Sequence, residues 1–196
     1  RKASSSSAQA VTSSKPSAPA QSRNRLLKAS ALSRAAVSAG DRAAFACLYD
    51  RLKAPVYGLA LSILRVRDDA EDVMQETLLK LYLERKPFRS PEHERYWVVR
   101  VAVNESKKLL RSPWRRRTGP LEEAGEPVFD TPQQSELYQH VMGLPPKYRA
   151  AVYLYYYEDC SVQEIAAAMG ANPSTVQTWL MRARGKLKLI LQEAES

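Results

Sequence analysis

The sequence predicts an all-α protein of two small helical domains joined by a flexible linker, the C-terminal one with a helix-turn-helix. Apolar residues recur at steps of three and four over most of the chain, as they do along the buried face of a helix. Residues 112–135, which are rich in Pro and Gly, interrupt this pattern and are expected to link a domain at 26–111 to one at 136–192. Residues 161–189 encode two short helices around a single turn.

The composition favours a partner that carries many negative charges. The chain has 196 residues, and 30 Lys and Arg against 21 Asp and Glu give a formal net charge of +9. Such an excess indicates nucleic acid or an anionic surface rather than a small acidic substrate. No apolar run approaches the roughly 20 residues that span a bilayer, and no signal peptide is recognisable, so we expect a cytoplasmic protein without membrane insertion.

Residues that usually carry enzymatic or metal chemistry are sparse. Cys47 and Cys160 lie far apart in apolar or aromatic surroundings, and the only histidines are His93 and His140. We expect two buried thiols, no metal site and no cofactor. Because no nucleophile lies beside a base and no Gly-rich phosphate loop is present, we expect no enzymatic activity.

The N-terminal domain follows a segment with the composition of a disordered tail. Residues 1–25 are rich in Ser, Ala, Gln and Pro and contain basic but no acidic residues. A weakly amphipathic helix is expected at 26–40. Asp41 is then expected to cap a longer apolar helix that reaches Leu64 and that Pro55 kinks or restarts.

A third helix, with Asp68 or Asp69 as its cap, is expected to run through residue 84. Its expected apolar face is formed by Val73, Met74, Thr77, Leu78, Leu81 and Tyr82. Its outward side carries an acidic and polar ridge at helical spacing, which consists of Asp69, Asp72, Gln75 and Glu76. Acids at the start of a helix also complement its macrodipole, and this simpler interpretation stays open for the first of them.

A fourth helix is expected at 92–112, after a loop at 86–91 in which Phe88 lies between two prolines. Its expected buried residues are Trp97, Val98, Val101, Ala102 and Leu109. The opposite face is basic and polar, with Arg95, Arg100, Asn104, Lys107, Lys108 and Arg111. A basic face is often only a solvated face, but its presence in the same chain as a helix-turn-helix favours contact with phosphates.

The C-terminal domain is expected to begin at Ser135 or Glu136. A helix at 146–158 carries an aromatic cluster, which we expect in the core and at its rim rather than as base-stacking groups: Tyr153, Tyr155, Tyr156 and Tyr157. The helix-turn-helix follows, with a Ser161–Glu164 capping box, Gly170 at the turn, and Asn172 and Pro173 opening the second helix. Ala166 and Val176 are expected where the two helices touch.

The second helix carries on its outward face the two classes of side chain that DNA recognition uses. Short hydrogen-bonding side chains lie at its start, at Ser174, Thr175, Gln177 and Thr178, and would read bases. Arg182 and Arg184 would contact phosphates. On this pattern alone, a helical hairpin with no DNA role remains the alternative.

Motifs from both domains together resemble those of one known family. They are D-A-E-D-V-M-Q-E-T at 69–77, then Trp97, Arg100 and Asn104, then L-P-P-K-Y-R at 144–149 and S-T-V-Q-T-W-L-M-R-A-R at 174–184. In this order, over about residues 40–192, they resemble bacterial RNA polymerase sigma factors of the extracytoplasmic-function (ECF) type, within the sigma-70 family.

This resemblance implies a transcription initiation factor that binds core RNA polymerase, directs it to −10 and −35 promoter elements and helps to open the DNA. It assigns binding of core polymerase to Asp69, Asp72, Gln75 and Glu76. It assigns −10 DNA binding to Trp97, Arg100, Asn104, Lys107 and Lys108 with the loop at 86–93, and −35 DNA binding to Ser174, Thr175, Gln177, Thr178, Arg182 and Arg184. It also implies an anti-sigma factor as a partner and a monomer when free. The main alternative is a helix-turn-helix repressor or activator that acts as a dimer without polymerase.

Overall fold

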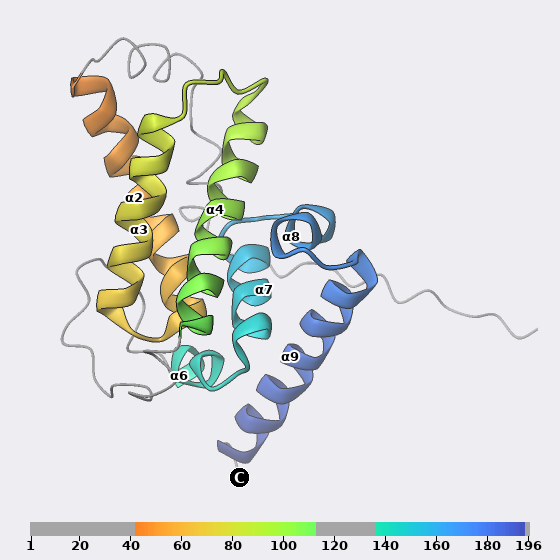
Figure 1. The fold of residues 1–196 in the computed structure, drawn as a ribbon. Helices are drawn as coiled ribbons and strands as arrows, with labels where there is room; N and C mark the ends of the chain where they lie inside the picture. Colours follow the sequence, from red (N-terminus) through yellow and green to blue (C-terminus); the bar gives the residue numbers. More distant parts are fainter. Residues whose placement is uncertain (1–41, 113–135, 195–196) are drawn as a thin grey trace, which may run out of the picture.

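The structure is a computed structural model that describes residues 42–112 and 136–194 (Figure 1). Within these ranges all regular structure is helical, which confirms the predicted fold class. The helices are α2 (Arg42–Leu64), α3 (Arg67–Leu83), α4 (Pro91–Arg111), α6 (Glu136–Met142), α7 (Pro146–Tyr156), α8 (Val162–Met169) and α9 (Pro173–Ala194). The predicted tail, the predicted helix at 26–40, the Asp41 cap and nearly all of the predicted linker lie outside the described residues.

Helix α2 is the central element of the N-terminal half, α2–α4. It packs against α3, α4 and α7, and nearly every residue from Leu52 onward is buried. The helix runs through Pro55 without restarting, so that part of the prediction is wrong. Because Pro55 is itself buried, tertiary packing on three neighbouring helices outweighs the hydrogen bond that a proline removes.

Helix α3 differs from its prediction at both ends. Its N-cap is Val66, which provides no side-chain hydrogen bond, so the prediction that Asp68 or Asp69 is the cap is wrong. Both acids instead lie in the first turn, where they complement the helix dipole. At the other end Tyr82 is 46% exposed rather than buried, and its ring meets Phe45 edge-on, with centroids 4.9 Å apart.

Helix α4 begins at a Ser90 cap, whose hydroxyl accepts a hydrogen bond from the His93 backbone N–H at 3.2 Å, and Pro91 occupies the first turn. Its burial differs from the prediction, because Trp97, Val101 and Leu109 are only partly buried. Val99 and Val103 join the core, and Arg95, which was assigned to the polar face, is only 5% exposed. The difference arises because α8, from the other half of the chain, covers this side of α4.

In the C-terminal half, α6–α9, the predicted capping box, turn and helix contact of the helix-turn-helix are confirmed, whereas α7 ends at Tyr156 rather than at Glu158. Ser161 and Glu164 form the reciprocal capping box of α8, and Gly170 ends that helix in the left-handed conformation with φ of 64°. Ala166 and Val176 are fully or almost fully buried at the crossing of α8 and α9. Of the four tyrosines, three are half-buried and Tyr157 is exposed, which agrees with positions at the rim of the core.

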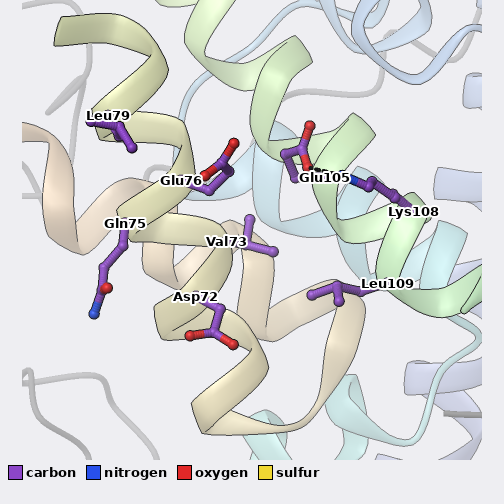
Figure 2. A pocket seen from close by; sticks show the side chains of 8 residues that line it. All are labelled: Asp72, Val73, Gln75, Glu76, Leu79, Glu105, Lys108 and Leu109. Carbon is purple, nitrogen blue, oxygen red and sulfur yellow. Dashed lines mark ion pairs between the residues drawn. The ribbon is translucent and has the colours of Figure 1, made fainter. Parts of the chain in front are cut away.

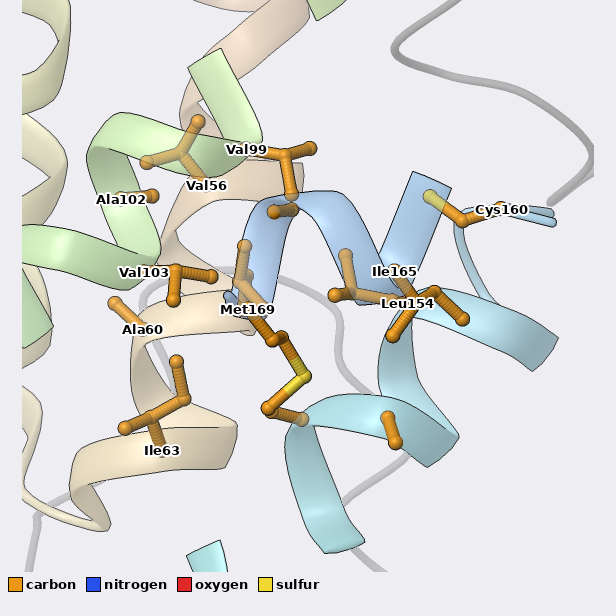
Figure 3. Close-up of a cluster of buried hydrophobic side chains, with 14 of the residues drawn as sticks. Val56, Ala60, Ile63, Val99, Ala102, Val103, Leu154, Cys160, Ile165 and Met169 are labelled. Atoms are coloured by element: carbon orange, nitrogen blue, oxygen red, sulfur yellow. The ribbon is translucent and has the colours of Figure 1, made fainter. Parts of the chain in front are cut away.

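The two halves share one continuous hydrophobic core. Figure 3 shows side chains from α2 and α4 meeting side chains from α7 and α8. The labelled residues of this contact are Val56, Ala60, Ile63, Val99, Ala102, Val103, Leu154, Cys160, Ile165 and Met169. The C-terminal half is therefore packed onto α2 and α4 rather than separate from them.

Three basic side chains fix this interface by donating to backbone carbonyls across it. Arg149, which is 3% exposed, donates to Ser62 O and to Ile63 O (2.9 Å) at the end of α2. Arg95 Nη2 donates to Glu158 O at 2.7 Å, and Lys107 Nζ donates to Met169 O at 2.7 Å. Ser62, Ile63 and Met169 lie at the ends of α2 and α8, where the last carbonyls have no partner within the helix, and Glu158 lies in the turn after α7. The cations therefore satisfy groups that burial would otherwise leave unpaired.

The two cysteines have different environments. Cys160 is buried at the interface, as predicted, and its Sγ accepts from Arg95 Nη2 at 2.9 Å. Burial raises the pKa of the Cys160 thiol to about 11, so it stays protonated at neutral pH. Cys47 is exposed, so the prediction of a second buried thiol is wrong: its position on α2 lies outside the buried stripe.

Candidate nucleic-acid and protein interfaces

The predicted acidic ridge lies on the outer side of α3. Asp72, Gln75 and Glu76 are exposed, and Asp69 is partly exposed. Between this ridge and α4 lies a groove of about 640 Å³ (Figure 2). Its lining consists of Asp72, Val73, Gln75, Glu76, Leu79, Glu105, Lys108 and Leu109. The groove is therefore acidic along α3 and mixed in charge along α4.

Ion pairs bridge the two walls of the groove. Lys80 Nζ lies 2.6 Å from Glu105 Oε1 on α4 and 3.1 Å from Glu76 Oε1 on α3. The hydrogen bond from Lys80 lowers the pKa of Glu105, and the same bond raises the pKa of Lys80. Glu76 is thus partly neutralised, whereas Gln75 points away from α4 (Figure 2). The part of the ridge most open to a partner is its Asp72–Gln75 end.

Sequence reasoning missed the apolar part of this surface. Leu79 is 49% exposed and Leu83 is 62% exposed, and both lie on α3. Leu79 follows Asp72 by seven residues and Gln75 by four, so it shares their face. That spacing was available in the sequence, but leucines on a helix are expected in the core before they are expected at an interface.

The structure divides the predicted −10 residues of α4 among three directions. Trp97, Arg100 and Asn104 follow one another at helical spacing along the outer face, with Arg100 and Asn104 exposed. Lys107 turns to one side, where it bonds to α8. Lys108 turns to the other, where it lines the groove 3.7 Å from Glu105 Oε2. Only the first three form one surface.

An aromatic cluster anchors the loop before α4 to this surface. The Phe88 ring meets Trp97 edge-on at a centroid distance of 5.7 Å and His93 at 5.4 Å. The Arg89 backbone N–H donates to His93 Nδ1 at 3.2 Å. The predicted loop therefore lies against the start of the Trp97–Asn104 face, where it adds apolar ring surface next to cationic and amide groups.

The predicted base-reading residues lie at the start of α9. Ser174 and Gln177 are exposed, and Thr175 and Thr178 are partly exposed. Thr178 Oγ1 donates to Ser174 O at 2.9 Å within the helix. The buried side of α9 is formed by Val176, Leu180 and Ala183, so the predicted set faces away from the core.

Tyrosines of α7 hold the two predicted phosphate-contacting arginines. Arg184 Nε donates to Tyr156 Oη at 2.8 Å, and its guanidinium also lies over the Tyr155 ring, 5.6 Å from the centroid. A hydrogen bond from Arg182 lowers the pKa of the Tyr148 phenol. Both arginines remain exposed, so their side chains are oriented by α7 and are still accessible to solvent.

Two other properties of the described ranges bear on function. Within 42–112 and 136–194, no helix is long and apolar enough to cross a membrane. Across the same residues, no three His, Cys, Asp or Glu side chains gather where they could hold a metal ion.

Both halves of the chain match known families. Residues 48–116 match the family described as Sigma-70 region 2, and residues 134–187 match Sigma-70, region 4. The first match covers α3 and α4 with most of α2, and the second covers the helix-turn-helix. The two families therefore coincide with the helices that carry the candidate surfaces.

Individual relatives cover most of the chain. The ECF RNA polymerase sigma factor SigM of Mycobacterium tuberculosis is 32% identical over 161 residues, which are 80% of this chain and 82% of SigM. RNA polymerase sigma factor SigV of Bacillus subtilis is 28% identical over 152 residues, covering 76% of this chain and 91% of SigV.

Solved structures share the fold. CnrH, in complex with the cytosolic domain of CnrY, has a TM-score of 0.58 at 22% identity and covers 85% of this chain and 98% of its own. The sigma factor RpoE of Bartonella quintana, in complex with the anti-sigma factor NepR, has a TM-score of 0.56 at 24% identity, over 70% and 89% of the two chains. From its sequence relatives and its two matched regions, the chain belongs to the ECF family of bacterial RNA polymerase sigma factors.

Proposed function

We propose that the chain binds core RNA polymerase through the Asp72–Gln75 end of the α3 ridge and the neighbouring Leu79. The observation that carries this proposal is the combination of exposed acidic and apolar side chains along one open groove. An acidic surface with an exposed leucine beside it fits a basic protein partner, because charge complementarity speeds association and apolar contact adds affinity.

Membership of the family makes the chain a transcription initiation factor, and the dimeric repressor is not favoured. Within that role we assign the −10 element to Trp97, Arg100 and Asn104 with the loop anchored by Phe88. The loop and this face offer ring surface for an unstacked base and a cation for the separated strands.

The start of α9 is assigned to the −35 element. Its exposed polar side chains match the dimensions and chemistry of the major groove, and the two oriented arginines lie where phosphates would flank it. We further propose an anti-sigma factor as a partner, as in the complex of RpoE with NepR, a monomeric free state, a cytoplasmic site of action and no catalytic activity.

The decisive experiment measures the affinity of the chain for bacterial core RNA polymerase. The double variant Asp72→Ala, Gln75→Ala should bind at least tenfold more weakly, a loss of about 1.4 kcal/mol. The matched control is Asp50→Ala, Gln163→Ala, which changes the same residue types at exposed positions on α2 and α8. If the ridge variant binds polymerase as tightly as the control, the docking surface lies elsewhere on the chain. If the wild-type chain binds no polymerase, the proposed function is wrong.

The division between base and phosphate contacts is tested on the polymerase complex. Arg182→Ala should weaken binding to all promoter sequences to a similar degree and lower the slope of log affinity against log salt by about one. A changed sequence preference with an unchanged salt slope would instead place Arg182 on a base.

A further inference from the structure

We propose that Met181 determines sequence specificity by packing against the C5-methyl group of a thymine in the −35 element, an inference that rests on the proposed role of α9. Met181 is 64% exposed, the most exposed of the large apolar side chains in the described ranges. Met181 is not part of the buried side of α9, which is formed by Val176, Leu180 and Ala183.

The position of Met181 places it among the predicted base-reading residues. It follows Thr178 by three residues and Gln177 by four, so all three lie on one outward face. The opposite face, with Val176, Leu180 and Ala183, is buried. From Gln177 to Met181 the helix rises about 6 Å, which corresponds to about two base pairs of DNA at roughly 3.4 Å each. Met181 therefore reaches a base pair next to the ones available to Gln177 and Thr178.

The chemistry of this face selects an apolar target. Thr178 uses its hydroxyl proton within the helix, on Ser174 O, so that donor is not offered to a base. Met181 has no hydrogen-bond donor and only a weakly accepting sulfur. In the major groove, the thymine methyl is the apolar group on a base edge, and apolar side chains distinguish thymine through it.

The surroundings of Met181 favour DNA over an apolar protein surface as its contact. Four exposed cations lie within the same two turns of α9: Arg182, Arg184, Lys186 and Lys188. An apolar partner would have to desolvate these charges, whereas two phosphate strands flanking a groove would pair with them. Tyr156 already orients one of the arginines at 2.8 Å, so this face is arranged before DNA binds.

The test uses the chain assembled with core RNA polymerase and a duplex library randomised at the −35 element. The wild-type complex should enrich a motif that contains a required thymine. That thymine is then replaced by uracil, which removes only the methyl group. We expect uracil to weaken wild-type binding about fivefold, and to leave the binding of a Met181→Ala complex unchanged. Leu189→Ala, at a 61% exposed leucine two turns further along α9, should behave like the wild type.

Each outcome separates the inference from the function on which it rests. Enrichment of no −35 motif by the wild type would overturn the assignment of α9 to that element. An enriched motif with equal uracil effects in the wild type and Met181→Ala would leave the assignment standing and overturn the role of Met181. A Met181→Ala chain that loses affinity for core polymerase itself, at unchanged sequence preference, would identify the residue as a protein contact and would also overturn it.

Discussion

The two flanks of α4 differ in how their charged side chains are used. On the flank toward α8, Arg95 and Lys107 donate to backbone carbonyls of the C-terminal half, within an apolar contact. On the flank toward α3, Glu105 and Lys108 take part in side-chain ion pairs along an open groove. Cations that cap buried carbonyls fix one geometry, whereas partly exposed ion pairs contribute little and exchange readily. The first flank is therefore built to hold the two halves together and the second to remain accessible.

This difference matters for promoter binding. The −10 and −35 positions lie about 25 base pairs apart by their own numbering, which is about 85 Å of B-form DNA at roughly 3.4 Å per base pair. Helix α9, with 22 residues, is only about 33 Å long at roughly 1.5 Å per residue, and it packs on a body that also contains α4. The proposed −10 and −35 contacts are therefore much further apart on DNA than the length of α9. The capped flank of α4 is what holds the two halves in their packed arrangement.

The largest effect is expected at Arg149, the most connected of the three capping cations. Arg149→Met keeps the aliphatic volume but leaves the last carbonyls of α2 without donors, which should cost about 3 kcal/mol of unfolding free energy. Denaturant unfolding of the full chain measures this loss. Arg85→Met, at an exposed loop position, is the control and should stay within about 0.5 kcal/mol of the wild type. Equal stabilities of the two variants would mean that water donates hydrogen bonds to the α2 carbonyls in place of Arg149.

The same contrast explains what the sequence could predict. The boundaries of α8 and the turn at Gly170 follow from capping and left-handed geometry, which act over four or five neighbouring residues. The burial of Arg95 depends on Glu158 O and Cys160 Sγ, which lie more than sixty residues away, and no periodicity within α4 signals such partners. Local signals thus specified the helix-turn-helix, whereas the interface between the halves could be seen only in three dimensions.

The candidate surfaces divide in the same way. Helical spacing alone placed Asp72, Gln75 and Glu76 on one outward ridge. Lys107 and Lys108 are also predicted to lie on one basic face of α4, but the two side chains diverge. Lys107 bonds to Met169 O on α8, whereas Lys108 pairs with Glu105 of its own helix along the groove toward α3. A helical wheel gives the direction of a side chain around the helix axis. It contains no information about the other helices that pack against that side chain.

A second prediction concerns a close approach between the two halves, at Gly58 and Tyr153. A Cβ added at Gly58 on α2 would lie 2.3 Å from Tyr153 Oη on α7, so Gly58→Ala should destabilise the chain by about 2 kcal/mol through overpacking. Gly185→Ala on α9 has nothing within 4 Å and should instead stabilise by up to about 1 kcal/mol, the usual preference of a helix for alanine. Tyr153→Phe removes the nearest atom and should recover part of the loss at Gly58 in a double-mutant cycle. Additive effects of the two changes would show that the clash is relieved by other movements.

The smallest expected effect is the difference in unfolding free energy between variants of two adjacent lysines on α4. This comparison tests the two flanks most directly, because one lysine lies on each. Lys107→Met removes the cap on Met169 O and should cost about 1 kcal/mol, since burial lowers the pKa of Lys107 and this desolvation offsets part of the hydrogen bond. Lys108 is 79% exposed at its side chain, so Lys108→Met should change the unfolding free energy by less than about 0.5 kcal/mol. Equilibrium denaturation at one salt concentration measures both. A larger loss for Lys108→Met would mean that the ion pairs along the groove stabilise α4 more than the hydrogen bonds to backbone carbonyls do. The flank toward α3 would then be the fixed one and the flank toward α8 the accessible one.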